Sequence, residues 1–422
     1  MTTGRAYVWS ANPACPLGGS LAIADVPLER LSHPVVSLRG RYADVRNGGQ
    51  IDDAAPATGA PGPRALGSAR PDANGNFLFA HGRGGGRIDK SARTAEFRSR
   101  YVEAARFGEV NTYFHLDRIA AYIDELLREL GAGSLPRVVA VVNAHHGAVD
   151  RGGGLRDGRM LRGRWRPFQG GHYRLPARRY EVAEYEALAA TGEIHLGPGR
   201  KLLTHGALVE CAGRSYRANA SHNPGIIYHE YGHHITRHTA DFRANALKPA
   251  EQQNNRKTAM DEGTCDYWTA VMLETPNIWA CHRRHDERVT HPRSLAAPKA
   301  MADYDPAPGA DPHSNGTIWG AALWELRARL AVADRDGARG ADRLVLAALR
   351  QVGRLGLDDS RPRVAAVRQA RLRFSSGLAA LLAADETLTG SRRHDTIIAV
   401  LGARGIHLPN GAAIAVVANR SR

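Results

Sequence analysis

The residues with the clearest chemical potential lie in the stretch IIYHEYGHHITRH at positions 226–238. Its centre reads His229-Glu230-x-x-His233, the HExxH pattern. On a helix, residues four positions apart project from one face with Cβ atoms about 5–6 Å apart, so the two imidazoles can bind one metal ion. Glu230 can then reach a water molecule at that metal without binding the metal itself. The pattern therefore predicts a metal site with a general base.

The sequence around this pattern favours a helix. Asn223 is a competent N-cap residue, and Pro224 is suited to the first helical turn. Gly232 lies in the helix interior, where glycine costs about 1 kcal/mol relative to alanine. We therefore expect Gly232 to permit the close approach of another element.

The chain contains 19 histidines, so the pattern alone does not establish a site. Roughly a few per cent of such chains would contain it by chance. A third protein ligand separates a catalytic metal site from coincidence. A histidine six residues after His233 would provide one, but Thr239 occupies that position. Glu262 in MDEGTCDYW is the remaining candidate, and Asp266 follows it on the same helical face, where a carboxylate can orient a ligating histidine.

HEYGH at 229–233, followed by EGTCDYW at 262–268, resembles the gluzincin zinc metallopeptidases, specifically the fungalysin-like branch related to thermolysin. Two further stretches resemble segments of that family, FGEVNTYFHLDRIAAYI at 107–123 and PHSNGTIWGAALWEL at 312–326. The resemblance extends from about residue 95 to residue 408. It implies an α+β, thermolysin-like fold with an α/β N-terminal lobe and a mostly helical C-terminal lobe.

The resemblance also implies a role for each matching residue. The ligands of one zinc ion would be His229, His233 and Glu262, and Glu230 would be the general base of peptide hydrolysis. Asp266 would orient a ligand, which by the same resemblance is His229. His313 would donate a hydrogen bond to the oxyanion of the tetrahedral intermediate. Whether calcium is also bound stays open.

The chain departs from the family pattern in several places. The interval between His233 and Glu262 holds 28 residues, which implies a loop insertion. This interval contains no tyrosine, which leaves Tyr304 as a weak substitute for the one that thermolysin uses there. The family's edge strand, which would align a peptide substrate, has no clear counterpart in the pattern, and GHYRLP at 171–176 is the segment we assign to it. The N-terminal segment resembles only the tail of the region that precedes the catalytic domain in the family.

The wider pattern predicts three parts. Residues 1–92 form a strand-rich N-terminal arm or linker, which the resemblance relates to a pro-region. Residues 93–240 form an α/β catalytic lobe that ends in the HExxH helix, and residues 241–422 form a helical lobe that supplies Glu262 and His313. In the catalytic lobe we expect a long helix that stops at Gly131, then a buried strand at RVVAVVNA, then an Arg/Gly-rich loop at 151–171.

The composition limits the partners. The formal net charge is +15, but the arginines are spread along the chain without interleaved aromatic residues, so no nucleic-acid partner is expected. No apolar run approaches eighteen residues, so no membrane helix is expected. Four cysteines do not form a disulfide scaffold in a chain of 422 residues, although Cys265 and Cys281 would be able to pair in a secreted protein.

Other conspicuous side chains have ordinary interpretations. Histidines outside the HExxH pair are expected to be surface or hydrogen-bonded residues, as for His145, His146, His238, His282 and His285. His234 and His238 are expected to point off the ligand face. Two tryptophans of the helical lobe, Trp319 and Trp324, are expected to pack its core.

The sequence thus predicts a zinc-dependent endopeptidase that acts on peptide or protein substrates. One alternative is a zinc aminopeptidase or amidase, which is disfavoured because no GAMEN-like amine-binding motif occurs. The other is a noncatalytic basic binding protein with a degenerate metal site. Glu230 argues against it, because a structural site needs no base and usually closes with four ligands. The resemblance implies secretion, although the chain as given shows no signal peptide. The oligomeric state and the cleavage preference are not predicted.

Overall fold

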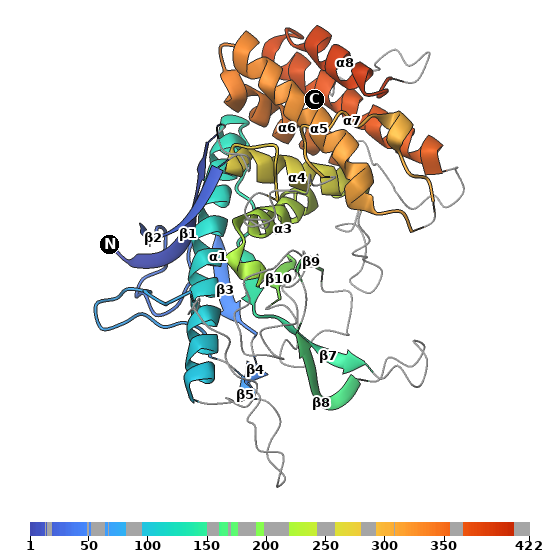
Figure 1. The fold of residues 1–422 in the computed structure, drawn as a ribbon. Coiled ribbons are helices and arrows are strands. Elements are labelled where there is room, and N and C mark those ends of the chain that lie inside the picture. The colour runs from blue at the N-terminus through green and yellow to red at the C-terminus, as the bar shows by residue number, and fades with distance from the viewer. Residues whose placement is uncertain are drawn as a thin grey trace. The chain divides into compact units, whose positions relative to one another are not determined.

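The computed structural model describes a defined subset of the chain, and every structural statement below concerns these residues. They are 1–12, 14, 19–48, 50–51, 64–65, 67–81, 95–149, 160–167, 170–175, 191–197, 219–242, 258–279, 293–307, 309–354 and 366–408. Within them the protein is a mixed α+β structure with seven α-helices and several small sheets, labelled in Figure 1. The predicted α+β class is therefore confirmed.

The chain divides into two compact units. The first comprises Met1–Ala121, Pro136–Tyr231 and Trp279–Val289, and the second comprises Tyr122–Leu135, Gly232–Ile278 and Thr290–Arg422. The boundaries fall inside two continuous helices, α1 (Ala95–Glu129) and α3 (Pro224–Arg237). Each unit is described separately below.

The first unit contains the sheets. Strands β1 (Thr3–Ala11) and β2 (Gly19–Pro27) form an antiparallel hairpin. A four-stranded sheet has the order β3-β6-β10-β9, with bounds Ala43–Asn47, Val138–Val142, Glu193–Leu196 and Gly171–Arg174. Strand β6 pairs in parallel with β3 and β10, whereas β9 is antiparallel to β10. All five residues of β6 are buried, so the predicted buried strand is confirmed.

Two small antiparallel pairs complete the described strands. They are β4 (Gln50–Ile51) with β5 (Arg64–Ala65), and β7 (His145–Val149) with β8 (Met160–Pro167). Strand β8 corrects the expectation of a continuous loop at 151–171. The β8 sequence MLRGRWRP combines arginines with the strand-favouring Trp165, whereas the glycines within and around it suggest a loop.

Helix α1 lies along the β1–β2 hairpin in the first unit (Figure 1). Asn111, at the centre of α1, is fully buried and bonds two backbone groups: its Oδ1 accepts from Tyr7 N (2.8 Å) and its Nδ2 donates to Ser221 O (2.8 Å). The helix ends before Gly131, whose φ of 62° is left-handed and suits glycine. The predicted stop at Gly131 is confirmed.

Two ionisable side chains of α1 are also buried within the first unit. His115 donates from Nε2 to the Tyr7 carbonyl (2.8 Å) and accepts at Nδ1 from the Tyr228 hydroxyl (2.7 Å), so its ring is neutral. Burial lowers the pKa of His115 to about 3. Glu109 accepts from Asn47 Nδ2 (2.7 Å) and Ala69 N (2.9 Å), and burial raises the pKa of its carboxyl to about 7.

The second unit is helical in its described part. Its helices are the end of α3, α4 (Ala259–Leu273), α5 (Pro312–Ala333), α6 (Gly337–Arg354), α7 (Ala366–Thr389) and α8 (His394–Ala403). A short 3-10 helix, η4 (Met301–Asp303), precedes α5, just as η1 (Ala220–His222) precedes α3 in the first unit. The run of helices predicted after residue 316 is confirmed, and Figure 1 shows α5 to α8 gathered together.

The core of the second unit contains one of the two tryptophans expected there. Trp319 is buried, stacks on Phe374 at 5.8 Å between ring centroids and donates from Nε1 to Thr264 Oγ1 (3.1 Å). Trp324 is half-buried, and the Arg327 guanidinium lies 5.3 Å from the centroid of its ring. The prediction is therefore confirmed for Trp319 and holds in part for Trp324.

Helices α4 and α5 approach each other at glycines. A Cβ atom at Gly263 would lie 2.2 Å from Gly316 O and 3.0 Å from Gly320 N, far inside normal contact. Only glycine lets the two backbones come so close. This glycine contact fixes the separation of the helix that carries Glu262 from the helix that carries His313.

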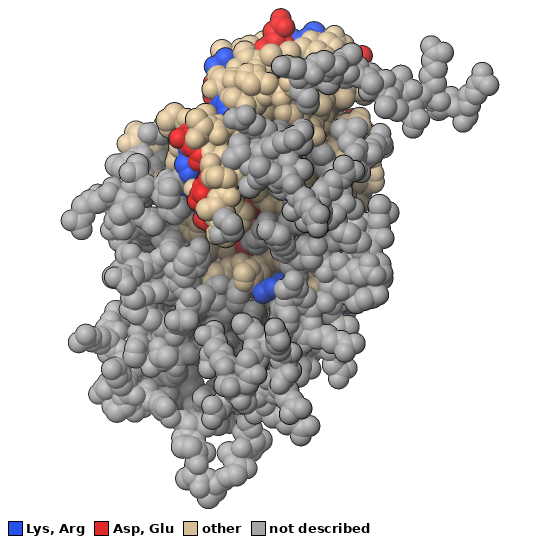
Figure 2. All heavy atoms as spheres, turned by 90° about the vertical axis from the view of Figure 1, so that its right-hand side faces the viewer, with Lys and Arg blue, Asp and Glu red and all other residues tan. Residues whose placement is uncertain are grey.

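Among the described residues, no helix combines the length and the apolar character that a membrane span requires. Figure 2 shows acidic and basic side chains next to one another on the described part of one face.

Candidate metal centre

Helix α3 begins where the sequence predicts. Asn223 Oδ1 accepts from the backbone N–H groups of Gly225 (2.9 Å) and Ile226 (3.3 Å), and Pro224 is the first helical residue. The helix then carries His229, Glu230 and His233, all buried, with the two histidines one turn apart on one face. The local signals thus place the HExxH side chains as expected.

Helix α4 carries the acidic residues. Its N-cap is Thr258, whose hydroxyl accepts from Asp261 N (3.2 Å), and Asp261 and Glu262 lie in the first turn, where the helix dipole favours negative charge. The helix passes very close to α3: a Cβ at Gly232 would lie 2.7 Å from Cys265 Cα. The expectation that Gly232 permits close approach is confirmed, and the neighbouring element is α4.

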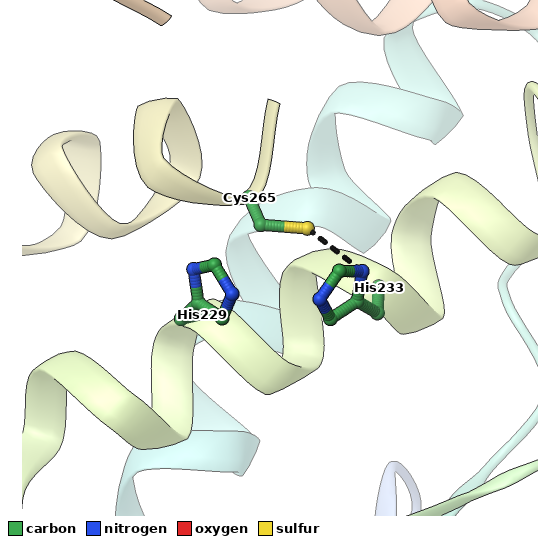
Figure 3. Close-up of side chains that lie close together, drawn as sticks. All are labelled: His229, His233 and Cys265. Carbon is green, nitrogen blue, oxygen red and sulfur yellow. Dashed lines mark hydrogen bonds between the residues drawn. The ribbon is translucent and has the colours of Figure 1, made fainter. Parts of the chain in front are cut away.

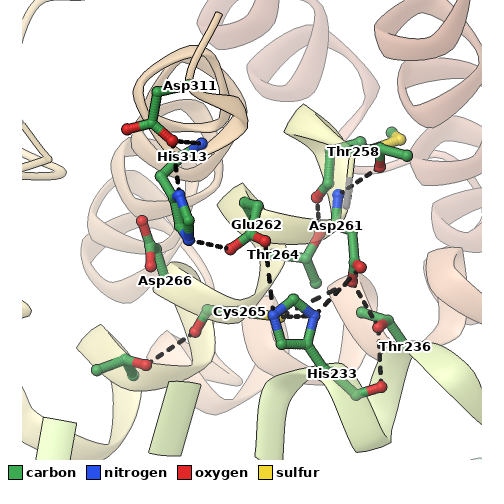
Figure 4. Close-up of polar contacts among 12 residues, drawn as sticks. His233, Thr236, Thr258, Asp261, Glu262, Thr264, Cys265, Asp266, Asp311 and His313 are labelled. Atoms are coloured by element: carbon green, nitrogen blue, oxygen red, sulfur yellow. Dashed lines mark hydrogen bonds and ion pairs between the residues drawn. The ribbon is translucent and has the colours of Figure 1, made fainter. Parts of the chain in front are cut away.

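The predicted third ligand lies beside the second histidine. Glu262 is fully buried, and its Oε1 lies 3.7 Å from His233 Nε2 (Figure 4). Its other oxygen, Oε2, lies 3.0 Å from His313 Nε2. Ligand atoms of His229, Glu262 and His313 all lie within 4.8 Å of one another. This set of two imidazoles and a carboxylate could hold a metal ion, and it includes His313, which the sequence analysis expects to be an oxyanion donor and not a ligand.

Cys265 adds a sulfur atom to the centre. Figure 3 shows its side chain beside His229 and His233, and ligand atoms of the three residues lie within 4.8 Å of one another. Cys265 is buried and present as a thiol, so no disulfide involves it in this structure. Its partner in the conditional pairing, Cys281, lies outside the described residues.

Asp261 orients His233 and was missed in the sequence. Its Oδ2 lies 3.1 Å from His233 Nδ1, and its Oδ1 accepts a hydrogen bond from the Thr236 hydroxyl (2.7 Å). Burial works to raise the pKa of Asp261, but the neighbouring His233 outweighs it and the pKa lies below its ordinary value. A carboxylate on Nδ1 fixes the tautomer in which Nε2 is available to a metal.

Asp266 has a partner that the sequence did not indicate. The Arg293 guanidinium donates to both of its oxygens, from Nε to Oδ2 (3.1 Å) and from Nη2 to Oδ1 (2.5 Å), and both residues are buried. This bidentate ion pair holds the Arg293 guanidinium beside α4, the helix that carries Glu262. The predicted contact of Asp266 with His229 stays a prediction.

His313 lies at the start of α5, as predicted. Asp311 is the N-cap of this helix, and its Oδ1 lies 2.7 Å from His313 Nδ1, while Glu262 faces the other ring nitrogen. Burial works to lower the pKa of His313, but the two carboxylates outweigh it and the pKa is raised. The hydrogen bond from His313 in turn lowers the pKa of Asp311 to about 2. With a carboxylate at each nitrogen, the ring is a double donor.

Glu230 faces strand β9 within the first unit. A Cβ at Gly171 would lie 2.6 Å from Glu230 Cγ and 2.7 Å from Oε1, so the β9 backbone runs directly against this side chain. Among the described residues, the buried Glu230 Oε2 has no hydrogen-bond partner. The sequence GHYRLP does form a strand over Gly171–Arg174, and β9 ends the described strand order. The pattern-based assignment of a strand there is confirmed.

The remaining sequence expectations fall outside the centre. His234 is fully buried and His238 is half-buried, with ring centroids 4.5 Å apart. Tyr304 is half-buried, and its role stays a prediction. Most of the interval between His233 and Glu262, and both His282 and His285, lie outside the described residues, as do the side chains of His145 and His146.

Comparison with known proteins does not assign the chain. No protein-family model matches it, and a search of curated proteins finds no match.

Proposed function

We propose that the chain is a zinc-dependent endopeptidase of the gluzincin type, with a fungalysin-like, thermolysin-related two-lobe fold. The observation that carries this proposal is the arrangement on two helices. His229 and His233 lie one turn apart on α3 with Glu230 beside them, and the α4 carboxylate of Glu262 lies 3.7 Å from His233 Nε2. A catalytic site needs these two imidazoles, the carboxylate and a separate base.

The donor set fits zinc. Two imidazoles and one carboxylate, from His229, His233 and Glu262, would be a ligand set typical of catalytic zinc, which leaves one position for water or substrate. Asp261 at His233 Nδ1 supplies the outer partner that metal-binding histidines usually have. A zinc ion bound there would act as a Lewis acid on the peptide carbonyl and lower the pKa of the attacking water.

The other residues supply proton transfer and charge stabilisation. Glu230 would accept a proton from the attacking water at Oε2, the atom without a partner among the described residues, and return it to the leaving amine. His313, a double donor held by Asp311, would donate to the oxyanion that forms at the substrate carbonyl.

Strand β9 supports a peptide substrate. It ends the described strand order of the first unit and its backbone contacts Glu230 at Gly171. An extended peptide can pair with the backbone groups of such a strand, which would place a peptide bond beside the base. This feature favours cleavage within a peptide chain, because backbone pairing with a strand needs no free terminus.

The test combines metal content with cleavage of an N-terminally blocked peptide. The purified chain is expected to hold about one zinc per molecule, to cleave the blocked peptide and casein, and to lose both activities on chelation. Glu230→Gln should keep its zinc and lose orders of magnitude in rate. Glu386→Gln, at an exposed position on α7, is the matched control and should change neither property.

Four outcomes would contradict the proposal. A fully active chain without metal would exclude zinc from the reaction, and an active Glu230→Gln variant would exclude the base. Cleavage of free but not blocked peptides would instead identify an aminopeptidase. A chain that binds zinc and cleaves no peptide would support the noncatalytic alternative.

A further inference from the structure

The two nitrogens of the His233 ring face different chemistry. Nε2 faces the Glu262 carboxylate at 3.7 Å, whereas Nδ1 lies 3.2 Å from Cys265 Sγ and 3.1 Å from Asp261 Oδ2. Figure 4 shows the ring between these groups. One edge of the imidazole is therefore lined by oxygen alone, and the other by sulfur and oxygen.

Helix geometry places Cys265 at this edge. Glu262 and Cys265 are three residues apart, so they project from neighbouring positions on the same face of α4. Gly232 has no Cβ, and this lets the backbone of Cys265 approach α3 within contact distance. The thiol is completely buried, so it is held at the histidine ring rather than in solvent.

We propose that His229, His233 and Cys265 form a second metal-binding mode of the centre, selective for thiophilic ions such as Cd²⁺ or Cu⁺. Their ligand atoms lie within 4.8 Å of one another (Figure 3), and His229 and His233 are fixed one turn apart by the continuous helix α3. Thiolate and imidazole ligands favour such soft ions, whereas carboxylate favours harder ones. On binding, the metal–sulfur bond to Cys265 and the metal–nitrogen bond to His233 Nδ1 form. The S–H proton leaves to solvent, and the Nδ1 proton that faces Asp261 leaves as the ring takes the tautomer protonated at Nε2.

The two modes exclude each other. The set with Glu262 and His313 also uses His229, so one ion occupies this residue at a time. A thiophilic ion would therefore displace the ion held on the Glu262 side and stop peptide hydrolysis. This consequence for activity rests on the proposed function, whereas the binding mode itself does not.

The experiment is a Cd²⁺ titration of the full chain after treatment with a chelator, followed by the ultraviolet charge-transfer absorption of cadmium–thiolate bonds. The wild-type chain is expected to show this absorption, and Cys265→Ser is expected to lose it. Three other cysteines are present, so a variant with Cys15, Cys211 and Cys281 replaced by serine serves as the matched control. It should keep the absorption in full, because Cys265 is unchanged.

The outcomes decide the proposal without any peptidase assay. Absorption that persists in Cys265→Ser, or that disappears from the triple variant, would assign the bond to another cysteine and overturn the proposal. Cd²⁺ binding without the absorption in the wild-type chain would overturn it as well. Glu262→Gln separates this result from the proposed function, because the variant should bind zinc weakly and still show the cadmium–thiolate absorption.

Discussion

Two buried polar networks differ in what their side chains contact. Along α1 in the first unit, Glu109, Asn111 and His115 each bond a backbone group of another segment. Around α4 in the second unit, Glu262 and Asp261 face histidine rings instead. The first network fastens backbone segments, so it contributes stability. The second brings titratable side chains together, which is the arrangement that chemistry requires.

The comparison shows that buried polarity alone does not mark a functional site. His115 is as deeply buried as any residue of the metal centre, yet both of its ring nitrogens are used by Tyr7 and Tyr228. His313 has both ring nitrogens on carboxylates and remains partly exposed. The partner type, not the burial, distinguishes the structural histidine from the chemical one.

The largest expected effect concerns His115 and stability. Its pKa is lowered from 6.5 to about 3, so below pH 6.5 the unfolded chain binds a proton that the folded chain refuses. The contribution of His115 to the free energy of unfolding is complete above pH 6.5 and is lost as the pH falls toward 3. The total loss is about 5 kcal/mol, at 1.36 kcal/mol per pH unit. His115→Gln keeps one donor and one acceptor and should lack this slope in urea titrations at several pH values. An unchanged slope would show that His115 is not the cause of the pH dependence of stability.

The next effect concerns His313 and rate. Removal of one oxyanion donor costs about 10²–10³-fold in kcat, so His313→Ala should lose that much peptidase activity while its zinc content and unfolding midpoint change little. His407→Ala, at an exposed position, is the matched control and should be indistinguishable from the wild type. Loss of zinc in His313→Ala would show that this histidine is a ligand rather than a donor.

Glu109 should affect stability with the opposite sign to His115. Its pKa is raised from 4.5 to about 7, so the unfolded chain ionises before the folded chain does. The contribution of Glu109 to the free energy of unfolding is complete below pH 4.5. It falls by about 3 kcal/mol as the pH rises to 7. Glu109→Gln should remove this slope, which is seen best in a His115→Gln background, where the opposing slope is absent. A slope that persists in the double variant would come from another group.

The smallest effect concerns Asp261 and metal affinity. Outer partners of metal ligands typically contribute about 10–100-fold in affinity, so Asp261→Asn should bind zinc about that much more weakly in competition with a chelator. The asparagine retains an acceptor for His233 and loses the charge. Asp395→Asn, exposed on α8, should not change affinity. Equal zinc affinities for Asp261→Asn and the wild type would show that the Asp261 charge does not support metal binding.

Much of the centre followed from local signals in the sequence. The cap of α3 and the acidic first turn of α4 depend on residues within one or two turns of each other. Gly232 in mid-helix indicated a close approach, although not which residue of α4 makes it. Such signals act locally, so a single sequence contains them. The strand at Gly171–Arg174 was predictable for the same reason.

The missed residues depend on distant parts of the chain. Asp261 precedes Glu262, and neighbours on a helix project about 100° apart, so no local pattern indicates that both face one histidine. In fact α4 passes so close to α3 that both reach His233, at its two different nitrogens. Arg293 reaches Asp266 from 27 residues away, in an irregular segment without a recognisable pattern. The strand β8 was hidden by its arginines and flanking glycines.

The glycine contact between α4 and α5 has a consequence for how the centre can fail. Glu262 and His313 are carried on backbones that touch at Gly263 and Gly316, so their spacing is set without any intervening side chain. One added methyl group at Gly263 would have to force the helices apart by more than an ångström to reach an ordinary contact. A mutational scan for loss of metal binding should therefore find Gly263, Gly316 and Gly320 beside the ligands themselves. These glycines take no part in the chemistry themselves. The distance between Glu262 and His313 is kept only while these positions carry no side chain.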